Sequence, residues 1–167
     1  MKYLFKSLLA VSLASGASNF TYAADASYAI KLMTPETALK AALAGLKKCR
    51  DGGYQVAVAI VDRTGQTQVM LRDRFAGMHT PEAAVSKAWT AISFKSNTSQ
   101  FADTTQSGKP ASGIRHIPKA LALGGGMMIE AGGILYGGVG VSGAPSGEAD
   151  DGCAKAAIEA ITEDLEM

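Results

Sequence analysis

Three side chains with binding chemistry, Arg72, Arg74 and His79, lie close together in the sequence. They come just before Thr80-Pro81-Glu82, a pattern typical of a helix start, with threonine as the cap and proline in the first turn. A helix start offers free amides and a partial positive charge, and guanidinium groups bind carboxylates through paired hydrogen bonds. The stretch is therefore a candidate site for an anionic ligand, for instance a small carboxylate.

A structural role for the same residues is the alternative. His79 would then fix its loop by hydrogen bonding, and the two arginines would pair with Asp73 or Glu82, since paired surface charges are common. The second histidine, His116, follows Arg115 in a long polar segment. Loop residues often carry function, so His116 is also a candidate ligand, although an exposed histidine can simply be solvated.

No catalytic array can be assigned from the order of the residues. The glycines at 124–126 lack the Lys-Ser/Thr pair that follows the glycines of a phosphate-binding loop. The two cysteines, Cys49 and Cys153, fit no zinc pattern, so we predict no metal site. Whether the protein is an enzyme is left open at this point.

The composition is that of one globular domain. The chain has 167 residues, of which 47% are hydrophobic and 19% are charged. The formal net charge is +1, and no basic run is interleaved with aromatic residues. Nucleic acid is therefore not expected among the partners.

The N-terminus has the layout of a secretory signal peptide, in which two lysines precede an apolar run over residues 8–17. This run is too short to span a bilayer stably. Cleavage that removes residues 1–23, or extends to Ala26, would leave no membrane span. We therefore expect a periplasmic or secreted protein with a single domain over residues 32–167. The alternatives are a buried helix or an uncleaved anchor.

Hydrophobic periodicity and capping residues predict the order α-β-β-α-β-β-α, with an antiparallel sheet and helices on its faces. Helices are expected at 34–52, at 80–95 and from Ser146 or Gly147 onward, with a short helix around 98–102, and strands at 54–62, 67–73, 127–130 and 134–142. Helical spacing predicts that the first helix buries Leu39, Ala42, Leu43 and Leu46. The same spacing predicts that the second helix buries Val85, Ala88, Trp89 and Ile92. Paired glycines between the last two strands predict a tight turn.

With these elements in order, the chain resembles the GlcG/HbpS-like haem-binding family, also called the haem-degrading domain family. The matching segments are Ala59–Gly65, Leu71–Gly77, Lys87–Ala91, Leu123–Gly126 and Gly138–Pro145. Their order and spacing are specific, and together they cover about Leu32 to Ile161. The resemblance implies a profilin-like α/β (α+β) fold, assembly into dimers or higher oligomers such as octamers, and binding of haem or another tetrapyrrole.

The resemblance also implies candidate ligands for haem. Haem iron takes His, Met, Tyr or Cys ligands, so His79 and His116 are candidates, with the arginines beside His79 available for the propionates. In one haem-binding relative a threonine near the second helix holds the iron, which makes Thr90 and Thr98 candidates here. Members that use a histidine on the first helix have no counterpart, because residues 34–51 contain none.

A disulfide between Cys49 and Cys153 follows from the implied fold. In a profilin-like fold the terminal helices share one face of the sheet and run antiparallel, which would bring the two cysteines together. An exported protein permits such a bond. Two separate buried thiols are the alternative.

The expected function is that of an exported, oligomeric haem- or tetrapyrrole-binding protein without robust catalysis. Two alternatives remain. One is an enzyme or accessory factor that acts on a small carboxylate or aldehyde at the anion site around His79. The other is a structural oligomer without a ligand.

Overall fold

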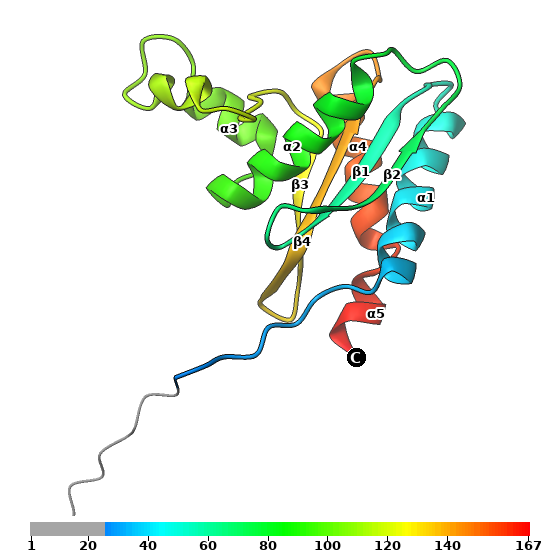
Figure 1. Cartoon of the computed structure of the whole chain (residues 1–167). Coiled ribbons are helices and arrows are strands. Elements are labelled where there is room, and N and C mark those ends of the chain that lie inside the picture. The colour runs from blue at the N-terminus through cyan, green and yellow to red at the C-terminus, as the bar shows by residue number, and fades with distance from the viewer. Residues whose placement is uncertain (1–25) are drawn as a thin grey trace, which may run out of the picture.

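The computed structural model describes residues 26–167, which form an α+β fold (Figure 1). The predicted N-terminal signal peptide lies outside the described residues. The described elements, in chain order, are α1 (Pro35–Asp51), β1 (Ala57–Asp62), β2 (Thr67–Arg72), α2 (Thr80–Phe94), α3 (Thr98–Thr104), the 3-10 helix η1 (Ser112–His116), β3 (Gly126–Ala131), β4 (Ile134–Ser142), α4 (Gly147–Glu159) and α5 (Thr162–Glu166). Within residues 26–167, no helix is both long enough and apolar enough to cross a membrane.

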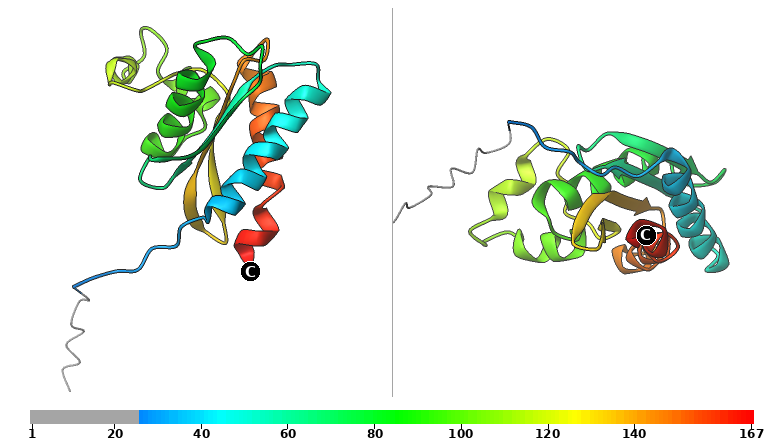
Figure 2. Two further views of the ribbon diagram at one scale, coloured as in Figure 1. Left: turned by 45° about the vertical axis from the view of Figure 1, so that its right-hand side comes forward. Right: turned by 90° about the horizontal axis from the view of Figure 1, so that it is seen from below.

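The four strands form one antiparallel sheet in the order β2-β1-β4-β3. Helices α1 and α4 lie side by side on one face, and α2 covers the other face (Figure 2). The predicted antiparallel sheet with helices on both faces is therefore confirmed. The short helix expected around residues 98–102 is present as α3, whereas α5 and the short η1 were not predicted.

The caps and turns follow the sequence signals closely. Thr34 caps α1 by accepting a hydrogen bond from the Thr37 amide at 3.2 Å, and Ser146 caps α4 by accepting one from Ala149 at 3.2 Å. The β3–β4 turn is made by Gly132 and Gly133, whose φ angles of 55° and 76° are easily reached only by glycine.

The buried face of α1 differs from the predicted one. Leu39 and Leu43 are 42% and 51% exposed, whereas Ala42 and Leu46 are buried as expected. The face that meets the sheet and α4 carries mostly small residues, namely Ala38, Ala41, Ala42, Gly45, Leu46 and Cys49. Small side chains let α1 approach the sheet and α4 closely. The predicted face, which included both leucines, is therefore rotated away from the face that is buried.

The buried face of α2 is also shifted from the prediction. Ala88 and Ile92 are buried as expected, but Val85 and Trp89 are only partly buried. The face toward the sheet includes Ala84, Ala91 and Lys87, and the burial of a lysine there was not predicted.

Helix α2 packs against β4 at a glycine. A Cβ atom at Gly140 would overlap the carbonyl oxygen of Ala84, so the helix backbone rests directly on the strand. Gly138, two residues earlier on the same face, would bring a Cβ to 2.9 Å from the carbonyl oxygen of Ala88. The glycines of this hairpin therefore serve close helix packing, as strand glycines often do.

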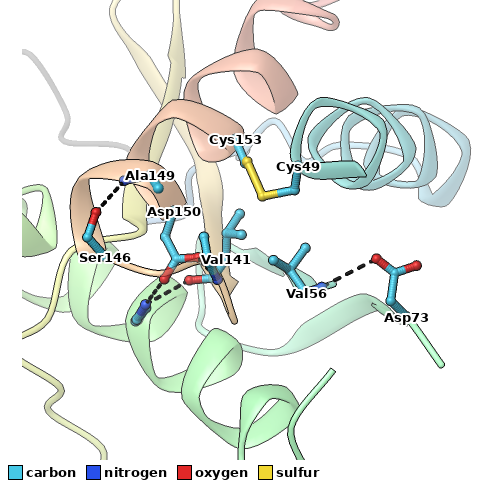
Figure 3. The surroundings of a disulfide bond; sticks show 10 residues. Cys49, Val56, Asp73, Val141, Ser146, Ala149, Asp150 and Cys153 are labelled. Carbon is cyan, nitrogen blue, oxygen red and sulfur yellow. Dashed lines mark hydrogen bonds and ion pairs between the residues drawn. A yellow bond between two sulfur atoms is a disulfide. The ribbon is translucent and has the colours of Figure 1, made fainter. Parts of the chain in front are cut away.

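On the opposite face, a disulfide joins Cys49 of α1 to Cys153 of α4 (Figure 3). Their Cα atoms are 5.5 Å apart, which is within the usual range for a disulfide. Helices α1 and α4 run in opposite directions along the sheet (Figures 1 and 2), so the end of one meets the start of the other. The predicted disulfide is confirmed, and it closes a loop of 104 residues.

We expect loss of this disulfide to lower the free energy of unfolding by about 4–5 kcal/mol, because a long closed loop restricts the unfolded chain. The measurement is urea unfolding of the wild type, with and without reductant, and of a Cys49→Ser/Cys153→Ser variant. Reductant should destabilise the wild type and leave the variant unchanged. If reductant does not change the unfolding midpoint of the wild type, the disulfide is not present.

We expect Gly140→Ala to destabilise the fold by about 1–3 kcal/mol or more, because α2 must move away from β4. Gly152→Ala is the matched control. Gly152 lies in α4, and a Cβ atom there would meet nothing within 4 Å. Because alanine is the better helix former, this control should gain up to about 1 kcal/mol. Equal thermal stability of the two variants would refute the close packing.

Candidate functional site

The loop between β2 and α2 is held from two sides. The Arg72 guanidinium donates a hydrogen bond to the Ala76 carbonyl oxygen within the loop. Asp73 is buried and accepts a hydrogen bond of 2.8 Å from Nε of Arg50 on α1, and one of 3.3 Å from the Val56 amide. The alternative in which Asp73 pairs with Arg72 or Arg74 is therefore wrong: its carboxylate is taken by Arg50.

His79 stands at the start of α2, but the expected threonine cap does not form. Helix α2 begins at Thr80, and the capping position is occupied by His79, whose side chain makes no cap hydrogen bond. The Thr80 hydroxyl instead donates to the Gly77 carbonyl oxygen at 2.8 Å. The backbone of His79 is already helical (φ −77°, ψ −18°), which draws Thr80 into the helix and removes its hydroxyl from the capping position.

Two large apolar side chains of this loop are exposed. Phe75 is 79% exposed and Met78 is 93% exposed, and Arg74 and His79 beside them are also exposed. We call Arg74, Phe75, Met78 and His79 the 74–79 cluster. Among residues 26–167, Arg74 has no ion-pair partner and the His79 ring has no hydrogen bond. The cluster combines apolar contact area, an imidazole, a thioether and a guanidinium on one loop.

The other predicted candidates lie apart from this cluster. His116 ends η1 and lines a separate cavity of about 350 Å³ with its neighbour Arg115, whose guanidinium fixes the loop by donating to the Thr105 carbonyl oxygen. Thr90 and Thr98 are fully buried. Their hydroxyls bond to backbone: Thr90 accepts from the Leu121 amide at 2.9 Å and donates to Ser86 at 2.7 Å, and Thr98 accepts from Gly126 at 2.8 Å.

A buried ion pair lies between α2 and α4. Nζ of Lys87 is 2.7 Å from Oδ2 of Asp150 and donates to the Val141 carbonyl oxygen at 2.9 Å. Lys87 has no exposed surface, and Asp150 is 3% exposed. Burial raises the pKa of Asp150 above its usual range, although the Lys87 ammonium and a hydrogen bond from the Ala144 amide act in the opposite direction.

This ion pair forms the floor of a cavity of about 270 Å³, which we call the Lys87 pocket. Its walls come from three segments. They are the residues around the start of α2, namely Gly77, His79 and Thr80, then Leu123, and then residues 142–147, from the end of β4 to the first residue of α4. Figure 3 shows Asp150 beside Val141, and Ser146 at the start of α4. The cavity thus joins His79 to a buried lysine that lies eight residues further along α2.

The sequence reasoning missed Lys87, Asp150 and Ser142 as site residues. A usable signal was present for the lysine, because it follows Ala84 by three residues and precedes Ala91 by four, which places it on the same helical face. The acidic residues after Ser146 were treated only as partners of the helix dipole. Nothing in the local sequence shows that one of them turns inward.

The arrangement defines an α+β protein with a polar pocket beside an exposed apolar loop. The family model "Haem degrading protein HbpS-like" matches residues 33–159, and the chain belongs to that family.

Solved structures of the same fold agree with this placement. A double mutant of HbpS from Streptomyces reticuli has a TM-score of 0.75 and 34% identity, covering 92% of this chain and 97% of that one. A complex of PduOC with haem has a TM-score of 0.74 and 33% identity, covering 78% of this chain and 96% of that one.

Among curated proteins, a corrinoid adenosyltransferase PduO from Salmonella typhimurium is 37% identical over 120 residues. The match includes 71% of this chain but only 35% of that protein. The chain therefore spans about a third of the length of this relative.

We expect separate removal of either member of the buried pair to destabilise the fold by about 3–5 kcal/mol, because an uncompensated charge remains inside. Lys87→Met leaves the carboxylate of Asp150, and Asp150→Asn leaves the ammonium. The double variant keeps the amide oxygen that can accept from Ala144, so it should recover most of the loss. Denaturant unfolding of the four proteins gives the coupling energy, and additive losses would contradict the pair.

The pH dependence gives a second test of the pair. An acid whose pKa is raised on folding makes the folded state bind more protons than the unfolded state. The cost of burying its negative charge therefore shrinks as the pH falls below the folded-state pKa, and it is gone below the unfolded-state pKa. In Lys87→Met the pKa of Asp150 should rise further, because the ammonium that lowers it is gone. The stability deficit of Lys87→Met should therefore shrink at acid pH, and a deficit that grows on acidification would argue against this assignment.

Proposed function

We propose that the protein is an exported, self-associating haem-binding protein, and that the 74–79 cluster contacts the haem. The observation that carries this proposal is the exposure of Phe75 and Met78 beside an unbonded histidine. Exposed apolar side chains gathered at one place mark surfaces that another molecule covers. The family of the chain and its similarity to PduOC, which was solved as a haem complex, support haem as that molecule.

The side chains of the cluster fit the parts of a haem. An imidazole or a thioether can ligate haem iron, so His79 is the proposed ligand and Met78 lies next to it. The Phe75 ring supplies apolar area for the macrocycle. The Arg74 guanidinium is free for a propionate, whereas Arg72 is engaged by the Ala76 carbonyl oxygen and positions the loop.

His79 is preferred over the other predicted ligands for a physical reason. Ligation by Thr90 or Thr98 would require each hydroxyl to give up its backbone hydrogen bonds at a fully buried position. Leaving the Leu121 or Gly126 amide unpaired in the interior would cost about 1–3 kcal/mol. His116 is accessible, but its cavity is lined by Ser107, Ser112, Gly113 and Arg115 and contains no large apolar side chain.

Export and self-association belong to the same proposal. The disulfide fits an oxidising compartment, and the N-terminal signal pattern, with cleavage after Ala23 or Ala26, fits a periplasmic or secreted location. The exposed Leu39 and Leu43, one turn apart on α1, offer apolar area for contact between copies. We propose haem binding without robust catalysis. The proposal includes neither corrinoid adenosyl transfer nor haem degradation.

We expect haemin titration of the purified protein to give a shifted, saturable Soret band, at one haem per subunit or per dimer. His79→Ala should lose the shifted band because the iron ligand is gone, while the matched control His116→Ala should keep it. The measurement is the absorption spectrum at increasing haemin. A wild-type spectrum like that of free haemin would exclude the function, and an unchanged His79→Ala spectrum would exclude the ligand.

A further inference from the structure

The Lys87 pocket contains a buried polar group that the fold leaves unused. Ser142, at the end of β4, is 5% exposed and lines the cavity. Within residues 26–167 its hydroxyl has no hydrogen-bond partner. Its position continues the alternation of Gly138 and Gly140, which face α2. The Ser142 residue is thus largely enclosed, and it lines an open cavity into which a ligand can bring an acceptor.

Lys87 offers a second unused donor at the floor of the same cavity. An ammonium group has three N–H donors. Two are accounted for by the Asp150 carboxylate and the Val141 carbonyl oxygen, and the described residues supply no acceptor for the third. A buried ion pair does not by itself indicate a role in stability, because apolar residues of similar size often stabilise a fold equally well. Its position beneath an open cavity favours a role in binding.

The start of α4 contributes a further donor at the cavity wall. This helix has 13 residues, and its Ser146 cap accepts the Ala149 amide. The amide of Gly147, which lines the cavity, has no acceptor within residues 26–167. Amides at a helix start favour a negatively charged oxygen. The Ser142 hydroxyl, the Lys87 ammonium and the Gly147 amide are thus donors around one small space.

We propose that the Lys87 pocket binds a small carboxylate, with the Ser142 hydroxyl and the Lys87 ammonium donating to its oxygens. The volume of about 270 Å³ admits a molecule of a few carbon atoms and excludes a macrocycle, so the ligand of the pocket is not the proposed haem, although His79 borders both sites. Leu123 and Pro145 supply apolar wall for a short carbon chain. Asp150 already balances the charge of Lys87. The affinity of the pocket for a carboxylate therefore depends on directed hydrogen bonds and on the partial positive charge at the start of α4.

The test is titration of the haem-free protein with acetate and with lactate, followed by amide chemical shifts in the 15N–1H spectrum. Saturable shifts should centre on residues 142–147 and 123–125. Ser142→Ala should weaken binding about 10-fold or more, since a hydrogen bond to a charged group is lost. Ser107→Ala, on an exposed loop, is the matched control and should bind as the wild type does.

Acetamide separates a carboxylate site from a site for any carbonyl compound. It has the shape of acetate without the charge, so it should bind at least about 10-fold more weakly if the helix start and the ammonium act as proposed. Absence of saturable shifts with acetate and lactate, equal binding by Ser142→Ala and Ser107→Ala, or equal binding of acetamide would each overturn the proposal. None of these outcomes depends on haem, because the titrations use the haem-free protein.

Discussion

The direct contact between the backbone of α2 and strand β4 is the constraint on which the rest of the structure depends. At Gly140 there is no room for a side chain beneath the Ala84 carbonyl oxygen. This contact sets the height of α2 above the sheet, and Lys87, on the same face of the helix, has no exposed surface. The lysine must then find its partners inside, and Asp150 and the Val141 carbonyl oxygen provide them.

The opposite face of the sheet is stabilised by different means. There α1 and α4 meet through small side chains and are joined by the Cys49–Cys153 disulfide (Figure 3). Because α4 also carries Asp150, the disulfide and the buried ion pair act on the first turns of the same helix from its two sides. The start of α4 is therefore fixed to both faces of the sheet, which gives the Lys87 pocket a rigid wall.

Much of this fold could be predicted from the sequence because its signals are local. The Thr34 cap, the Ser146 cap and the Gly132–Gly133 turn each depend on a few neighbouring residues. The burial of Leu39 and Leu43 was predicted wrongly because hydrophobicity alone cannot distinguish a face that packs closely through alanines from one that carries leucines. The disulfide required knowledge of the fold, which only the family resemblance supplied.

The candidate sites also divide into residues that local sequence signals identify and residues that they do not. His79 could be found because histidine beside arginines is a chemical signal in itself, even though its expected relation to the Thr80 cap was wrong. Lys87 and Asp150 could not be paired, since they are 63 residues apart and each has an ordinary surface role on its own helix. Ser142 carries even less signal, because a serine at the end of a strand is unremarkable until its neighbours are placed.

The two proposed sites meet at the first residues of α2, yet they place different demands on the protein. The walls of the Lys87 pocket come from a single chain and are held by the ion pair, the Ser146 cap and the contact at Gly140. That pocket is therefore complete in one subunit. The 74–79 cluster has the opposite character, because Phe75 and Met78 have little cover of their own within the described chain. Residues 26–167 offer little to enclose a haem there, so haem affinity should depend on assembly, whereas occupation of the Lys87 pocket should not.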